Sequence, residues 1–309
     1  MKVKTIKAVI RKKINAWLST IEDEKLRELV SKNVIVTGGC IPSMLLKEKV
    51  NDFDIYFRTR QVASSVANYY VDKFNPRLKK GIIPDISVLE IGDRIKIVVK
   101  SAGVASDEGT EKPYQYFEST SDDSAGEYVS EIMDNPGEIE DVYTETKEKS
   151  LEVQSDYRPV FLSTNAITLS DRVQLIHRFY GEPEDIHKNY DFIHCTNYWT
   201  SWEDKLTLNQ PALESLLAKE LIYVGSLYPI CSVMRLRKFI KRNWTVNAGQ
   251  ILKMMMQISE LDLTNIEVLE DQLTGVDCAY FCEIIAKIKA KDPEKVNSAY
   301  LVEIIDRMF

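Results

Sequence analysis

The stretch that most constrains this chain is residues 34–57, which read VIVTGGCIPSMLLKEKVNDFDIYF. A short apolar run predicts a buried strand that ends at Gly38 and Gly39, and a short amphipathic stretch after them predicts a helix. A second apolar strand follows and carries Asp52 and Asp54. A strand, a glycine turn, a helix and another strand within so few residues predict the beginning of an α/β domain.

The two aspartates are unusual because strands favour β-branched and aromatic residues. Alternate residues of a strand point to the same face, so Asp52 and Asp54 would place two carboxylates side by side. Like charges at that spacing repel unless a cation lies between them, and Mg²⁺ takes carboxylate and phosphate oxygens together. Gly38 and Gly39 would let a phosphate approach the backbone at the start of the helix. The pattern therefore predicts a site for a metal-bound triphosphate, although a plain turn beside a solvated edge strand would share these features.

The rest of the chain divides into two parts by pattern. We expect an α/β domain over residues 1–205 and a helical domain over residues 206–309. Within the first, residues 101–157 are acidic, rich in Ser and Gly and poor in aliphatic residues, which predicts an extended or partly disordered insertion. An acidic flap that regulates access to the site is the alternative.

The predicted elements follow from periodicity and turn residues. Two helices are expected over residues 5–31, with Ser19 or Thr20 as the cap of the second. Further helices are predicted over residues 60–75, 182–190, 210–226, 230–244, 247–259, 278–290 and 298–309. Strands are predicted as a hairpin over residues 86–99 and as single strands over 160–163, 173–179 and 191–199.

Composition narrows the functional classes. The 309 residues are 44% hydrophobic and 28% charged, and no apolar run approaches the ~18 residues of a membrane span. The basic beginning of the chain has helical periodicity and lacks a signal-peptide core. Five scattered cysteines predict free thiols in a reducing, cytoplasmic setting. A net charge of −7 argues against a general nucleic-acid coat, but not against a local basic groove.

Residues 34–57 resemble the nucleotidyltransferase signature of the DNA polymerase β superfamily, and most of all its branch of CCA-adding enzymes and bacterial poly(A) polymerases. That branch carries Gly-Gly-x-Val-Arg-Asp-x-Leu-Leu-Gly, a short spacer and Asp-x-Asp. The positions that match without a gap are Gly38, Gly39, Ile41, Leu45, Leu46, Asp52 and Asp54. Pro42 and Ser43 stand in place of the Arg-Asp pair, which in that branch helps to hold the nucleotide and the primer end.

The resemblance also implies a third carboxylate on a later strand. The stretch VQLIHRF is similar to the strand that carries it, but has Gln174 at the matching position. Asp191, at the start of the strand predicted over 191–199, is the better candidate, ahead of Asp171 and Asp85. A structural role for Asp191 as a cap or turn residue stays open.

A looser resemblance concerns YPICSVMRLRKFIKRNW, which is similar to the family's basic helix at Pro229, Arg237 and Lys241. Arg237 and Lys241 are therefore expected to bind the nucleotide. A second set of basic residues falls on one helical face at i, i+3 and i+7 and is expected to bind RNA. This set is Arg235, Lys238 and Arg242. A solvated helix face is the alternative for both sets.

Taken together, we expect a magnesium-dependent nucleotidyltransferase of the polynucleotide adenylyltransferase or tRNA nucleotidyltransferase type. It would move a nucleoside monophosphate from ATP or another NTP to an acceptor hydroxyl, foremost an RNA 3′ end such as that of tRNA. Asp52, Asp54 and Asp191 would bind two Mg²⁺ ions, and Gly38, Gly39 and Ser43 would hold the β- and γ-phosphates.

Two other interpretations remain at this point. A protein-modifying nucleotidyltransferase would share the glycines and the aspartate pair without needing an RNA groove. A degenerate module that only binds nucleotide or RNA would explain the amide at Gln174. The sequence does not indicate the oligomeric state.

Overall fold

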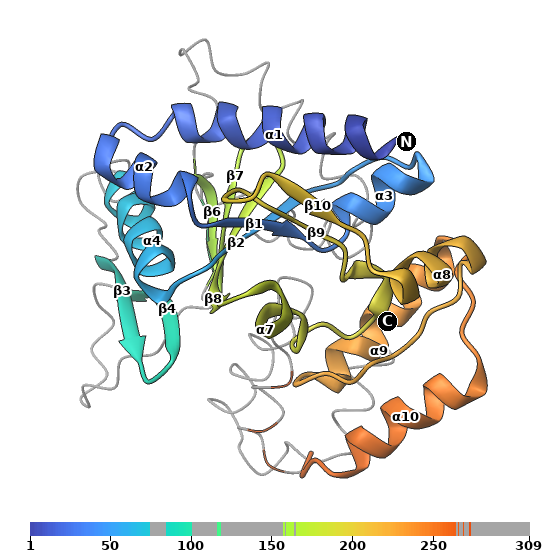
Figure 1. Ribbon diagram of the computed structural model, residues 1–309. Coiled ribbons are helices and arrows are strands. Elements are labelled where there is room, and N and C mark those ends of the chain that lie inside the picture. The colour runs from blue at the N-terminus through green and yellow to red at the C-terminus, as the bar shows by residue number, and fades with distance from the viewer. Residues whose placement is uncertain are drawn as a thin grey trace, which may run out of the picture. The chain divides into compact units, whose positions relative to one another are not determined.

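The computed structural model describes residues 1–74, 85–100, 116–118, 157, 159–163, 165–263, 265, 268 and 272 (Figure 1). The chain divides into two compact units. The first contains Met1–Lys188 and His194–Leu216, and the second contains Asn189–Ile193 and Leu217–Phe309. The boundary expected after residue 205 therefore lies inside the first unit, which the chain leaves after Leu216.

Two N-terminal helices begin the first unit, α1 (Val3–Ser19) and α2 (Glu24–Ser31). The apolar stripe of α1 is buried and includes Trp17, whose indole N–H donates to the hydroxyl of Tyr70 over 2.8 Å. The cap predicted for α2 is wrong. Asp23 caps this helix by accepting from the amide of Leu26, whereas Ser19 and Thr20 donate their hydroxyls back to carbonyls of α1.

An eight-stranded sheet forms the centre of the first unit, with the order β10-β9-β1-β2-β8-β7-β6-β5. Its strands are β1 (Val34–Thr37), β2 (Phe53–Phe57), β5 (Tyr116–Glu118), β6 (Pro159–Ser163), β7 (Ala166–Leu169), β8 (Val173–Tyr180), β9 (Tyr198–Thr200) and β10 (Lys205–Thr207). Neighbouring strands are antiparallel except β2 and β8, which run parallel. This mixed sheet with helices confirms the predicted α/β fold class.

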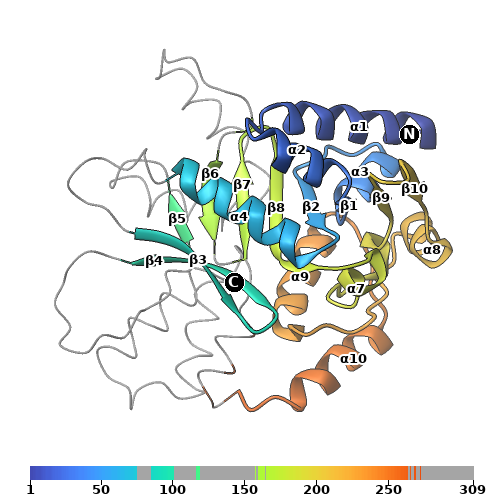
Figure 2. The same ribbon diagram turned by 60° about the vertical axis from the view of Figure 1, so that its left-hand side comes forward.

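Three helices bury one face of the sheet. Apolar residues of α1, α2 and α4 (Arg60–Phe74) form one core cluster with Val34 and Val36 of β1 and with Ile55 of β2 (Figure 2). Short α3 (Cys40–Leu46) connects β1 to β2. The predicted hairpin is confirmed as β3 (Asp85–Ile91) and β4 (Arg94–Lys100), which pair with each other as a separate sheet.

The strand predicted over residues 191–199 is wrong. Phe192 makes a single bridge to Tyr223, a 3₁₀ turn covers Ile193–Cys195, and β9 begins only at Tyr198. The physical reason lies at Asp191, whose carboxylate accepts a hydrogen bond from the amide of Phe192 over 3.0 Å. Such a local bond competes with the ladder of a strand.

The helices predicted over 182–190, 230–244 and 247–259 are confirmed as α7 (Pro183–His187), α9 (Pro229–Lys241) and α10 (Ala248–Ser259). The helix predicted over 210–226 is shorter, because α8 (Gln210–Ala218) ends at Ala218, and Glu220 and Tyr223 form isolated β-bridges instead. The second unit packs around an aromatic cluster. Phe239 of α9 contacts Phe192 at 5.6 Å and Trp244 at 5.7 Å between ring centroids.

Two sets of expectations lie largely outside the described residues. These are the helices over 278–290 and 298–309, and the acidic stretch 101–157 apart from β5 and Tyr157. β5 pairs antiparallel with β6 at the edge of the sheet, and Tyr157 is buried. Of the helices in the described ranges, none is long and apolar enough to cross a membrane.

Candidate functional site

The two aspartates lie at the start of β2. Phe53 is 7% exposed and Ile55 is fully buried in the core beneath the helices. Asp52, directly ahead of the strand, is exposed, and Asp54 is partly exposed. Alternation along the strand therefore turns Asp54 away from the helical layer and leaves both carboxylates accessible.

The register of the sheet fixes the neighbours of Asp54. Thr37, the last residue of β1, pairs with Asp54 on one side, and Gln174 of β8 pairs with it on the other. Residues that pair directly across strands share a face, and neighbouring strands lie about 4.8 Å apart. Asp54 consequently lies between a hydroxyl-bearing and a carboxamide-bearing side chain on the face opposite the core.

The glycine turn follows Thr37 directly. Gly38 has φ = 83°, a left-handed conformation that favours glycine, and its amide donates to the carbonyl of Cys195 over 3.2 Å. Gly39 has an ordinary φ of −72°, and a Cβ placed on it would meet no atom within 4 Å. Gly38 is thus required by the turn itself, whereas Gly39 borders open space.

The negative charges of the two carboxylates also affect Cys40, the first residue of α3. Burial raises the pKa of the Cys40 thiol well above its ordinary value, and the negative charges of Asp54 and Asp52 raise this pKa further. Both carboxylates therefore act on the start of α3, next to the glycine turn. The glycine turn and the aspartate pair therefore lie close together, as the pairing of Thr37 with Asp54 also indicates.

A partly buried histidine that sequence reasoning missed supports the glycine turn. The Thr37 hydroxyl lies 2.9 Å from Nε2 of His187 and 2.9 Å from the carbonyl oxygen of Asn197. Because a carbonyl only accepts, the hydroxyl can donate to Asn197 while His187 donates to the hydroxyl. Burial lowers the pKa of His187 from 6.5 to about 4, so its ring is neutral at pH 7. The pattern of the short helix α7 contains no signal for this contact, which only the fold creates.

Asp191, the predicted third carboxylate, belongs to the second unit together with Arg235. Oδ2 of Asp191 accepts from Nη1 of Arg235 over 2.5 Å, and Oδ1 accepts from the amide of Phe192. The two side chains are 11% and 35% exposed, respectively. The contacts give both residues a structural role within the second unit, and their predicted roles in metal and RNA binding stay predictions.

The other predicted residues lie on two helices. Ser43 is on α3, and its amide donates to the carbonyl of Gly39 over 3.1 Å. The remaining basic residues belong to α9 and its C-cap. Arg237 and Lys241 are exposed, whereas Lys238 and Arg242 are partly exposed.

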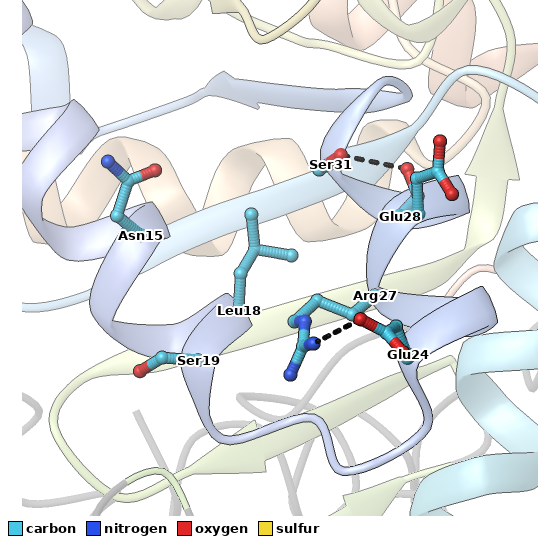
Figure 3. A pocket seen from close by; sticks show the side chains of 7 residues that line it. All are labelled: Asn15, Leu18, Ser19, Glu24, Arg27, Glu28 and Ser31. Carbon is cyan, nitrogen blue, oxygen red and sulfur yellow. Dashed lines mark hydrogen bonds and ion pairs between the residues drawn. The ribbon is translucent and has the colours of Figure 1, made fainter.

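A shallow hollow lies elsewhere on the first unit, between α1 and α2 (Figure 3). It is lined by Asn15, Leu18, Ser19, Glu24, Arg27, Glu28 and Ser31. Arg27 and Glu24 form an ion pair of 3.6 Å across one side of it. None of the predicted site residues lines this hollow, and its charges are of both signs.

The donor set at the aspartates is small. In the part of the chain that the structure describes, no group of three or more His, Cys, Asp and Glu side chains converges as a metal site. Two carboxylates nevertheless fit Mg²⁺, which keeps several waters and is usually bound by one or two carboxylates together with substrate phosphates. The residues present therefore suit a cation that binds with a phosphorylated ligand.

Fold and site together define a mixed α/β protein whose paired carboxylates stand beside a glycine turn, on the sheet face opposite its helical core. Residues 8–219 match the model of the Gabija anti-defense 2 family, and the chain belongs to this family. A curated relative, "Gabija anti-defense 2" of Bacillus phage SPbetaL7, is 23% identical over 107 residues. The match covers 34% of this chain and 27% of that relative.

Among solved structures, the chain is similar to the Thermotoga maritima CCA-adding enzyme complexed with tRNA, with 12% identity and a TM-score of 0.38. That match covers 92% of this chain and 57% of the enzyme. A tRNA-processing enzyme with CTP is 11% identical with a TM-score of 0.33, over 78% of this chain and 47% of the other. The chain thus spans about half the length of these solved proteins.

Proposed function

We propose that the protein is a magnesium-dependent nucleotidyltransferase that moves a nucleoside monophosphate from an NTP to an acceptor hydroxyl. The observation that carries this proposal is the position of Asp54. It pairs in register with the last residue before the glycine turn, on an accessible sheet face, with Asp52 exposed beside it. A carboxylate pair beside a glycine turn suits a metal-bound triphosphate.

Each part of the site has a separate task in the reaction. Asp52 and Asp54 would hold Mg²⁺, which neutralises the triphosphate and lowers the pKa of the acceptor hydroxyl. The open space at Gly39 would admit the β- and γ-phosphates, and Ser43 would contact them. The hydroxyl oxygen forms a bond to the α-phosphorus, the bond to the bridging oxygen of pyrophosphate breaks, and a carboxylate of the pair accepts the hydroxyl proton.

The acceptor is proposed from the family rather than from the fold. Membership of the Gabija anti-defense 2 family supports a role against the Gabija defence, so we propose a side-chain hydroxyl of a protein of that system as the acceptor. Two observations agree with a protein acceptor. Pro42 and Ser43 replace the Arg-Asp pair that helps to hold a primer end, and Arg235 is engaged with Asp191. Transfer to an RNA 3′ end is the competing outcome.

The test uses each α-³²P-labelled NTP with Mg²⁺ in lysates of cells with and without the Gabija system. We expect one labelled protein that depends on the Gabija system. Labelled RNA would show that the acceptor is an RNA end and not a protein. Nucleotide that binds to the protein without being transferred would indicate a binding module. Asp52→Asn combined with Asp54→Asn should reduce labelling at least a hundredfold.

The matched control for that variant removes two exposed carboxylates elsewhere, as Asp72→Asn combined with Glu203→Gln, and should keep full labelling. The Asp52 and Asp54 variant should melt no earlier than wild type, because it removes like charges from one face. Full labelling by this variant would refute the proposed function. Early melting would instead show that the pair is structural.

A further inference from the structure

The carboxamide of Gln174 lies beside Asp54, and the proposed reaction gives it no role. Gln174 pairs with Asp54 across the parallel strands β2 and β8, so the two side chains share a sheet face. Its neighbours along β8, Val173 and Leu175, are buried in the core beneath the helices. Gln174 itself is partly exposed on the side of the carboxylates.

The side chain also lacks a structural task within the described part of the chain. No described residue forms a hydrogen bond with the Gln174 carboxamide, which is partly exposed. By contrast, Thr37, on the other side of Asp54, is fully buried and contacts His187 and Asn197. The carboxamide oxygen is therefore available beside Asp54.

From these positions we infer that Gln174 supplies a neutral oxygen ligand, directly or through a bound water, to the divalent cation held by Asp52 and Asp54. The inference rests on the proposed function and names a further residue of the same site. Carboxamide oxygens belong to the ligands that Mg²⁺ and similar hard cations accept. The site then offers two negative charges and one neutral ligand from β2 and β8.

This charge balance has a consequence for the order of binding. Two carboxylates neutralise one divalent cation and leave no net charge to attract a second. A triphosphate brings several further negative charges, so a second cation should bind only together with the nucleotide. In nucleotide-free protein we therefore expect one weak cation site.

The test measures Mn²⁺ binding to the full-length, nucleotide-free protein by electron paramagnetic resonance. Gln174→Glu keeps the shape of the side chain and adds a carboxylate beside the cation. It should tighten Mn²⁺ binding by about thirtyfold, which corresponds to one unit charge about 4 Å from a divalent cation in water. Gln174→Ala should weaken Mn²⁺ binding several-fold.

A matched control lies one strand away. Thr168 of β7 pairs with Gln174 and shares its face, but stands two strands from Asp54. Thr168→Glu adds the same charge at about 9 Å, where screening at 0.15 M salt should limit the tightening to about twofold. The control separates a ligand of the cation from a general change in charge.

Thermal unfolding gives a second readout. Without a cation, the Gln174→Glu variant should melt earlier than wild type, because it places like charges on directly paired residues. Saturating Mn²⁺ should reverse this difference. An effect of Gln174→Glu no larger than that of Thr168→Glu would overturn the inference.

Failure of the inference and of the proposed function are distinguishable. If wild type binds Mn²⁺, Asp54→Asn abolishes the binding and Gln174→Glu leaves it unchanged, the role of Gln174 is wrong and the site stands. If wild type binds no Mn²⁺ with or without a non-hydrolysable NTP analogue, both the site and the role of Gln174 are wrong.

Discussion

Replacing Asp191 by Asn separates the two roles that this residue can have. As a metal ligand, Asp191 would contribute to cation binding and little to stability. As the partner of Arg235, it would contribute to the stability of the second unit. The structure favours the second role, because Oδ2 of Asp191 lies 2.5 Å from Nη1 of Arg235 and Oδ1 accepts from the amide of Phe192.

The magnitude follows from the exposure of the two partners. Breaking a fully buried ion pair costs about 3–5 kcal/mol, whereas exposed pairs contribute about 0–1 kcal/mol. Asp191 is 11% exposed and Arg235 is 35% exposed, so solvent partly screens the pair. We therefore expect Asp191→Asn to lower the free energy of unfolding by about 2 kcal/mol. This loss corresponds to a decrease in Tm of about 3 °C for a chain of 309 residues.

The assay combines thermal unfolding with Mn²⁺ binding on the same samples. Arg235→Gln should lower Tm by a similar amount, and the double variant should be about as stable as each single variant, because the pair is lost only once. Asp72→Asn, which removes an exposed carboxylate on α4, should leave Tm unchanged. An unchanged Tm for Asp191→Asn with Mn²⁺ binding at least tenfold weaker would refute the structural role and restore the metal ligand.

Two further predictions concern the glycine turn. The pKa of His187 is about 4 in the folded protein and 6.5 when unfolded, so the unfolded state takes up the proton first as the pH falls. Stability should therefore decrease between pH 6.5 and pH 4, by about 2 kcal/mol after allowance for partial exposure, and His187→Gln should remove this share of the slope in urea unfolding. An unchanged slope would contradict the assignment. Gly39→Asn keeps a residue suited to the N-cap of α3 and fills the open space, so Tm should stay constant while KM for the NTP rises about tenfold. A normal KM would exclude phosphates from this space.

Local patterns predicted most of the elements, because hydrophobic period and turn residues act over a few positions. The helical stripe of α1, the Gly-Asp turn of the β3–β4 hairpin and the alternation of β8 are all local signals. Reliance on local signals also explains why the strand expected over residues 191–199 was wrong. Its apolar content favoured a strand, but the carboxylate of Asp191 binds the next amide, and that contact depends on one side-chain orientation.

The candidate site likewise contains residues that local patterns indicate and residues that only the fold brings together. The glycines and the aspartate pair are adjacent in the sequence, so their spacing and the resemblance indicated them together. Gln174 was noticed only through its resemblance to a carboxylate position, and the register of the sheet then placed it beside Asp54. His187 and Thr37 meet across 150 residues, and no local pattern encodes such a contact.

The parallel pairing of β2 with β8 has a consequence for synthesis of the protein. Asp54 meets Gln174 only after about 120 further residues have left the ribosome, whereas β1 is available as a partner from the start. During that interval the second edge of β2 has no native neighbour, and unpaired edges are where nascent sheets aggregate. Slow translation would therefore prolong the exposure of this strand edge. A premature stop before β8 would release a fragment that contains the whole glycine and aspartate motif but leaves one edge of β2 unpaired.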